Sequence, residues 1–217
     1  MDADAADPVV LEYPFRGRWL ARNSPARRVP SHGTGLFGVT YAIDFVGVDQ
    51  HGRSSPITWR TAFATEPAEL FVGFGRPVLA PATGTVLATH DGETDHEARR
   101  SPFAAFPYLL TQRERARGGA AGLAGNRVII GLGPSGPFVL PAHLRRWTVG
   151  VRPGDRILAG QQVGECGNSG NSTHPHIHVQ VIDAPRFDET ARGVPLAFRH
   201  PGFPEARVPA ESEIITA

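Results

Sequence analysis

The chain has 217 residues, which is enough for one domain with a sizeable core, and a formal net charge of +1. This charge balance gives no reason to expect a nucleic acid or an anionic membrane surface as a partner. No run approaches the roughly 18 consecutive apolar residues of a membrane span, and the single cysteine, Cys166, excludes an intrachain disulfide.

Three regions are expected along the chain. Residues 1–30 are predicted to form an arm that packs on the domain through Trp19 and Leu20, residues 31–183 the main domain, and residues 184–217 a Pro-rich wrapping tail. The acidic N-terminal residues lack the basic and apolar regions of a secretory signal. The predicted location is therefore cytoplasmic if the chain is complete, or cell envelope or secreted if a leader was removed or export is unconventional.

Short β-branched and apolar segments separated by Gly and Pro turns predict many strands and few helices. The predicted class is all-β, with an antiparallel two-sheet sandwich or open barrel-like core. Strands are expected near residues 40–48, 77–79, 84–90, 127–131, 138–143, 156–158, 162–166 and 176–182.

Residues 92–125 form a long insertion between two of these strands. Within residues 102–117, apolar side chains recur at helical spacing before a run of Arg, which predicts a short amphipathic helix that ends at Gly118 and Gly119. Long insertions are often lids or binding loops, although a surface excursion without function fits equally well. His90 and His96, at the start of this region, are expected to be solvated.

The segment His176-Ile177-His178 follows a run rich in Gly, Asn and Ser. Side chains alternate across a strand, so His176, His178 and Gln180 are expected on one face, with Ile177 and its apolar neighbours on the other. Imidazole is the commonest metal ligand and also a general base near neutral pH. A single His-x-His is weak evidence for either use.

Other polar residues interrupt apolar segments in a way that strengthens this signal. Asp44 lies inside an apolar strand-like run, where a carboxylate is costly unless it is paired or binds a metal. His32 precedes it in a Gly-rich segment, and His143 ends another apolar run. Each residue alone also fits a structural explanation, such as an Asp that caps a turn.

Taken together, these residues resemble the lysostaphin-type (LytM-like) zinc endopeptidases of bacterial peptidoglycan. The resemblance extends over about residues 31–183. It is carried, in order, by His32 with Asp44, the segments 75–86 and 151–161, His143-Leu144, the Gly-Asn-Ser-Gly run 167–170, and His176-Ile177-His178.

The resemblance implies that His32, Asp44 and His178 hold one Zn²⁺ ion and that His143 and His176 are catalytic. It implies hydrolysis of glycyl or D-amino-acid-containing cross-links, with metal-bound water as the nucleophile. Eleven residues separate His32 from Asp44, whereas the family usually has three. His51 is the alternative ligand, but it lies in a segment that predicts an exposed turn.

Two other functions remain open on the sequence. One is an inactive binding or regulatory module for cell-wall hydrolases, which is opposed by the full set of ligands. The other is a phosphocarrier-like β-sandwich with paired histidines, in which Asp44 would have no explanation. The sequence leaves open the bond that is cut, which of His143 and His176 is the base, the task of the insertion, and the oligomeric state.

Overall fold

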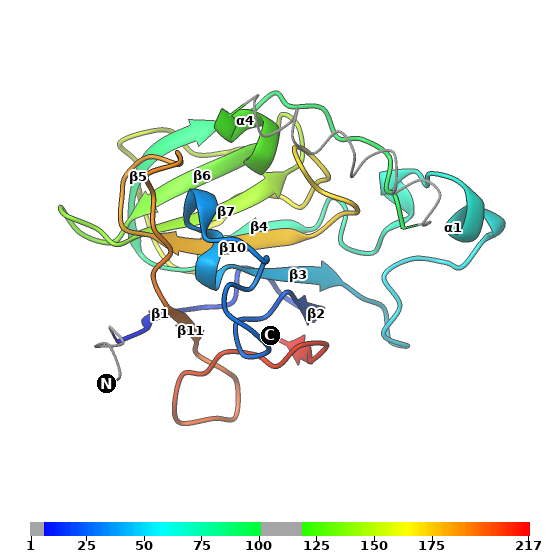
Figure 1. Cartoon of the computed structure of the whole chain (residues 1–217), viewed down its shortest axis with the longest axis horizontal. Helices are drawn as coiled ribbons and strands as arrows, with labels where there is room; N and C mark the ends of the chain where they lie inside the picture. The colour runs from blue at the N-terminus through cyan, green and yellow to red at the C-terminus, as the bar shows by residue number, and fades with distance from the viewer. Residues whose placement is uncertain (1–6, 101–118) are drawn as a thin grey trace.

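Strands dominate the computed structural model, which describes residues 7–100 and 119–217 (Figure 1). The strands are β1 (Val9–Leu11), β2 (Arg18–Arg22), β3 (Ile43–Gly47), β4 (Pro77–Leu79), β5 (Gly84–His90), β6 (Asn126–Gly131), β7 (Phe138–Leu144), β8 (Arg156–Ile157), β9 (Gln162–Glu165), β10 (Ile177–Ile182), β11 (Leu196–Phe198) and β12 (Ile214–Thr216). The helical segments are η1 (Leu36–Tyr41), α1 (Trp59–Phe63), η2 (Ala68–Leu70) and α4 (Gly119–Ala124).

One large sheet organises the described residues. It has eight strands in the order β12-β2-β3-β10-β7-β6-β5-β8, and every neighbouring pair is antiparallel. Two small sheets accompany it: β4 with β9, which is antiparallel, and β1 with β11, which is parallel. The all-β class is confirmed, with the second layer divided between these two small sheets.

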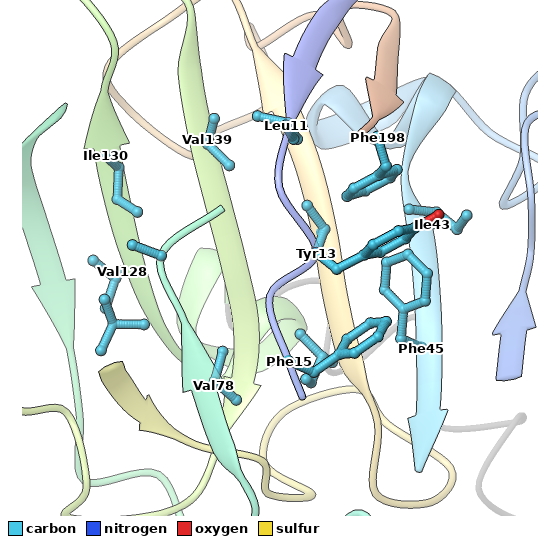
Figure 2. Packing of buried hydrophobic residues seen from close by; sticks show 14 of the residues in the cluster. Leu11, Tyr13, Phe15, Ile43, Phe45, Val78, Val128, Ile130, Val139 and Phe198 are labelled. Carbon is cyan, nitrogen blue, oxygen red and sulfur yellow. The ribbon is translucent and has the colours of Figure 1, made fainter. Parts of the chain in front are cut away.

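The main core lies between the large sheet and the small sheets. Apolar residues from β1, β4, β9 and β11 pack with those from the inner face of the large sheet. Figure 2 shows Tyr13, Phe45 and Phe198 gathered there, and the Tyr13 ring lies 5.0 Å from that of Phe198 and 5.9 Å from that of Phe45, centroid to centroid. Aromatic rings bury large areas in such clusters and add contacts of defined geometry.

The opposite face of the large sheet carries a smaller apolar cluster and polar residues. On β10, Ile177, Val179 and Val181 belong to the main core, as the alternation predicts. His178 and Gln180 lie on the other face and are also buried. This face, away from the main core, is where the candidate site is built.

The strands expected from the sequence in the middle of the chain are confirmed as β3 to β10. The terminal strands β1, β2, β11 and β12 were not anticipated. Their segments are three to five residues long, too short for alternation to stand out against loop. Trp19, expected to anchor an arm, is fully buried in β2, which pairs with β3.

The amphipathic helix expected over residues 102–117 lies outside the described residues. Gly119, expected to follow that helix, instead begins α4. On the other flank, the Asp95 carboxylate accepts hydrogen bonds from the backbone N–H of Asn168 (2.6 Å) and of Arg146 (2.9 Å). The described start of the insertion is therefore fastened to the segments that follow β7 and β9. No helix in residues 7–100 or 119–217 is long and apolar enough to span a membrane.

Candidate metal centre

A cavity of about 380 Å³ lies on the face of the large sheet away from the main core. It is lined by Asn23, His32, Thr34, Leu36, Phe37, Val39, Asp44, Leu123, Ala124, His143, Asn171, Thr173, His176, His178, Gln180 and Phe187. All five residues singled out from the motifs therefore line one cavity, although they come from distant parts of the chain.

Strand pairing brings Asp44 and His178 together. The two residues are direct cross-strand partners in the antiparallel pair of β3 and β10, and side chains of such partners on one face lie within contact distance. The Asp44 Oδ1 atom is 2.9 Å from His178 Nδ1. Both side chains are buried, with exposed fractions of 6% and 7%, so the carboxylate requires a cation or donors as partners.

His32 reaches the same carboxylate from the loop before η1. Its Nε2 atom lies 3.1 Å from Asp44 Oδ2, and its ring centroid lies 5.1 Å from that of His178. The Ser31 hydroxyl donates its single hydrogen to the Val39 carbonyl (3.1 Å). The hydroxyl oxygen, 3.0 Å from His32 Nδ1, is then an acceptor for that N–H. The remaining nitrogen, Nε2, directs its lone pair toward Asp44.

These residues fit a metal ion by the chemistry of their donors. Ligand atoms of His32, Asp44 and His178 lie within 4.8 Å of one another. With the Nδ1 proton of His32 used by Ser31, the neutral His32 ring and the Asp44 carboxylate face each other with lone pairs. Such a pair is stable only with a cation between the two groups, either a proton or a metal ion.

His143 enters the cavity because of a β-bulge. Asn126 pairs with Leu144 and Arg127 pairs with Ala142, so His143 is an extra residue opposite the junction between them. Its φ of 60° lies in the left-handed region. In a regular strand His143 would share the core-facing side of Val139, but the bulge directs its ring to the site. Bulges of this kind often re-aim a side chain next to an active site.

The rings of His143 and His176 are neighbours, with centroids 4.7 Å apart. Each ring directs Nδ1 to a backbone carbonyl: His143 to Ser169 (2.8 Å) and His176 to His174 (2.8 Å). A carbonyl only accepts, so Nδ1 carries the hydrogen in both rings and Nε2 is left for chemistry in the cavity. His176 Nε2 is 3.6 Å from Asp44 Oδ1.

Burial and the central carboxylate set the protonation of the group. Burial lowers the pKa of His143 well below its usual value, and a proton on the neighbouring ring of His176 or His178 would act in the same direction. Burial also lowers the pKa of His176, against the opposing effect of Asp44. For His32, burial is outweighed by the charge and hydrogen bond of Asp44, and the pKa is raised. His143 and His176 are therefore neutral bases at neutral pH.

The Asp44 carboxyl stays ionised despite its burial. Desolvation alone would raise its pKa, but the charges of His32 and His176 and the hydrogen bonds from His178 and His32 together hold that pKa well below the usual range. A buried negative charge in contact with three imidazoles, those of His32, His176 and His178, is an electrostatic feature that favours a divalent cation.

Other histidines and the cysteine lie elsewhere. His51 is exposed in a turn in which Asp49 Oδ1 accepts its backbone N–H (2.8 Å), as expected. His96, expected to be solvated, is instead half-buried, with Nε2 2.9 Å from the Gly170 carbonyl. The sequence did not reveal this contact, because it joins segments 74 residues apart.

His90 is partly exposed beside Glu93. Cys166 is buried, and burial raises the pKa of its thiol.

Two polar residues of the site were not predicted to act there. The Asn23 amide donates to Asp44 Oδ2 (2.7 Å); its backbone is left-handed, with φ of 50°, a conformation that Asn tolerates better than most residues but that no sequence pattern announces. Gln180 contacts His178. Its place on the His178 face was readable from alternation, whereas its contact was not.

Comparison with known proteins supports a peptidase. Residues 113–189 match the model of peptidase family M23. The resemblance read from the motifs is thereby confirmed at the level of the family. The matched segment includes His143, His176 and His178, and it leaves out His32 and Asp44.

Solved structures similar to this chain include two catalytic domains. The catalytic domain of lysostaphin from Staphylococcus simulans is 19% identical, with a TM-score of 0.38, and the match covers 74% of this chain and 86% of that one. A mutant catalytic domain of the prophage-encoded M23 protein EnpA from Enterococcus faecalis is 17% identical, with a TM-score of 0.40, and the match covers 88% and 90%.

Proposed function

We propose that this chain is a zinc-dependent endopeptidase that hydrolyses peptide cross-links of bacterial peptidoglycan. The observation that carries the proposal is that ligand atoms of His32, Asp44 and His178 converge on one point. Beside them lie the rings of His143 and His176, which bind backbone carbonyls through Nδ1 and leave Nε2 for the cavity. The family match over residues 113–189 supports the peptidase chemistry. Retention of every motif residue argues against an inactive binding module.

Zinc fits the donor set. Two imidazoles and one carboxylate are common Zn²⁺ ligands, and three protein ligands are typical of catalytic rather than structural zinc. A second group, His143, His176 and His178, also brings ligand atoms within 4.8 Å of one another. We favour the group that contains Asp44, because a carboxylate offsets the charge of the ion. When bound, the ion would polarise the scissile carbonyl and lower the pKa of water toward ~7.

His143 and His176 supply the proton transfer. Both are neutral at neutral pH because burial lowers their pKa values, and both keep a free lone pair at Nε2. One ring therefore accepts the proton of the attacking water. A ring protonated at Nε2 then presents an N–H donor to the developing oxyanion or to the leaving nitrogen. The two rings are close enough for either assignment.

The cavity favours an uncharged peptide segment. Leu36, Phe37, Val39, Leu123 and Phe187 give it an apolar side. Polar side chains that can hydrogen-bond a peptide backbone complete the lining: Asn23, Thr34, Asn171 and Thr173. Apart from Asp44 and the histidines, the lining residues within the described part of the chain carry no charge. Glycyl and D-amino-acid bonds, which the family resemblance implies, are compatible with such a lining.

The test is removal and return of the metal. A chelator should abolish cleavage of a cross-linked muropeptide or a pentaglycine peptide, and one equivalent of Zn²⁺ should restore it. His51→Ala is the matched control, because it removes an exposed imidazole that does not line the cavity. Cleavage that persists at full rate in metal-free protein would contradict the proposal, as would cleavage of neither substrate by zinc-loaded protein.

A further inference from the structure

Gln180 links His178 to the segment between His32 and Asp44. It is two residues beyond His178 on the same face of β10 and is 1% exposed. Its Oε1 atom lies 2.9 Å from His178 Nε2, and its Nε2 atom donates to the backbone carbonyl of Phe37 at 2.9 Å. The side chain therefore joins a candidate metal ligand to a backbone group that belongs to η1.

These contacts fix the direction of each hydrogen bond. A backbone carbonyl only accepts, so the amide NH₂ of Gln180 must face Phe37. The amide oxygen must then face His178, and an oxygen can accept only if His178 Nε2 carries the hydrogen. The other nitrogen, Nδ1, is the atom 2.9 Å from Asp44 Oδ1. Without metal, a proton lies between this nitrogen and the carboxylate, and a bound metal ion would replace that proton.

The backbone around Phe37 is held firmly. Phe37 and Gly38 are both left-handed, with φ of 57° and 73°. A Cβ at Gly38 would lie 2.4 Å from Ile182 Cγ2, so this position admits only glycine against β10. The Ser31 N–H and hydroxyl tie the start of the segment to its end, at Thr40 (2.9 Å) and Val39 (3.1 Å). The position of the Phe37 carbonyl is therefore fixed by the surrounding backbone.

From this geometry we infer that Gln180, oriented by the Phe37 carbonyl, is a positioning residue that keeps a hydrogen on Nε2 of His178 and so reserves Nδ1 for the metal position. The inference rests on the proposed function for its link to metal. It also explains why more residues separate His32 from Asp44 than is usual: the extra residues include Phe37, whose carbonyl orients Gln180. Hydrogen-bond partners of ligating histidines commonly set their tautomer and basicity.

His143 and His176 carry their hydrogen on Nδ1, the opposite ring nitrogen from that of His178. Carbonyls of Ser169 and His174 keep hydrogen on Nδ1 of His143 and His176, which leaves Nε2 facing the cavity. His178 lies on the regular strand β10, and its Nδ1 faces Asp44. It therefore needs its hydrogen on Nε2, and within residues 7–100 and 119–217 no backbone carbonyl accepts from that atom. Gln180 supplies the acceptor instead.

The first test reads the tautomer directly in metal-free protein. In ¹⁵N-labelled protein, the imidazole nitrogen shifts should show that Nε2 of His178 carries a hydrogen. Gln180→Leu should convert His178 to a mixture of tautomers or to Nδ1–H. Gln180→Glu keeps an acceptor and should retain Nε2–H. Ile182→Val, a packing change on the same strand beside Gly38, should leave the tautomer unchanged.

The second test is zinc affinity, measured by competition with a chromogenic chelator. Gln180→Leu should weaken binding about 10–100-fold, the usual cost of losing such a partner, and Gln180→Glu should restore most of it. Gly38→Ala should weaken binding in the same direction by displacing the Phe37 carbonyl, with Gln180 intact; it replaces Gln180→Leu if that variant does not fold.

An unchanged tautomer and unchanged zinc affinity in a folded Gln180→Leu variant would overturn the inference. So would a Gln180→Glu variant that behaves like Gln180→Leu, because the acceptor would then be irrelevant. A wild-type protein that binds no zinc would instead refute the proposed function. The tautomer measurement separates the two outcomes, because it needs neither metal nor substrate.

Discussion

Asp44 and Phe45 are adjacent on β3, yet their side chains belong to different parts of the molecule. Phe45 is fully buried among the aromatic rings of the main core. Asp44 points to the other face and is surrounded by His32, His176 and His178. The core face is built from regular strand alternation, whereas the site face depends on irregular backbone: the bulge at His143 and the left-handed residues Asn23, Phe37 and Gly38.

The difference separates what stabilises the fold from what performs the chemistry. Substitutions on the core face should lower the free energy of unfolding while the folded molecules keep their metal. Substitutions on the site face should remove metal or turnover while the sheet remains folded.

The largest effect is expected from the proposed metal ligands. Alanine at His32, Asp44 or His178 should each reduce zinc content to near zero and abolish turnover, because a three-ligand site does not survive the loss of one ligand. Zinc is measured by elemental analysis after gel filtration, and folding by circular dichroism. His51→Ala should keep its zinc. Loss of zinc in His51→Ala, with His32→Ala unaffected, would reverse the ligand assignment.

The next largest effect is expected from the two proposed proton-transfer residues. His143→Ala and His176→Ala should keep nearly stoichiometric zinc and lose ~10²–10⁴-fold in kcat, the range expected for a general acid or base. Steady-state cleavage of a cross-linked peptide measures this. Unchanged kcat in both variants would refute the mechanism. Zinc loss in His176→Ala would mean instead that the ion uses the group of three histidines.

On the core face, Phe45→Ala should lower the free energy of unfolding by about 3–5 kcal/mol, through lost burial and the cavity that remains. Denaturant unfolding at several pH values measures this, and the zinc affinity of the folded fraction should match that of the wild type. Asp44→Ala is the partner experiment on the adjacent residue. A Phe45→Ala protein that is as stable as the wild type but binds no zinc would contradict the separation between a core face that stabilises the fold and a site face that binds the metal.

The smallest effect is a pH dependence far from the site. The His200 ring lies between the Tyr13 hydroxyl (2.8 Å) and Arg207 (3.1 Å). Because Arg207 only donates, the ring is bound in its neutral form. Burial and the charge of Arg207 lower the pKa of His200.

The unfolded chain binds a proton at His200 more readily than the folded chain. The stability that His200 contributes is therefore present above its unfolded pKa of about 6.5 and is lost as the pH falls below it. Between pH 7.5 and 5.5, His200→Gln should flatten the fall in the thermal midpoint by roughly 2 °C. His51→Gln should not. Identical pH profiles for wild type and His200→Gln would show that the contact contributes nothing.

The sequence predicted the regular parts of this molecule well. Alternation and turn residues locate β3 to β10, and the order of the motif residues predicts a group that the structure brings into one cavity. Their assignment as ligands or bases stays a prediction. The backbone irregularities were not predictable, because His143 in a bulge and Phe37 at positive φ are set by long-range pairing and not by local propensity.

The terminal strands escaped prediction for a related reason. β1 gains its strand conformation by pairing with β11, and β12 by pairing with β2. Three-residue segments carry almost no periodic signal of their own. Asn23 is similar: its amide reaches Asp44 because the chain turns sharply at the end of β2, and nothing in the neighbouring residues indicates that turn.

The parallel pairing of β1 with β11 also has a consequence for the order of assembly. It joins residues near position 10 to residues near position 197, and the site joins Asp44 to His178, 134 positions later. Contacts that span so much of the chain close large loops and predict slow folding. On a ribosome, His32 and Asp44 emerge long before β10 can pair with β3. The group of side chains around Asp44 is therefore among the last parts of the molecule to form, and a nascent or truncated chain without β10 should lack the proposed metal centre.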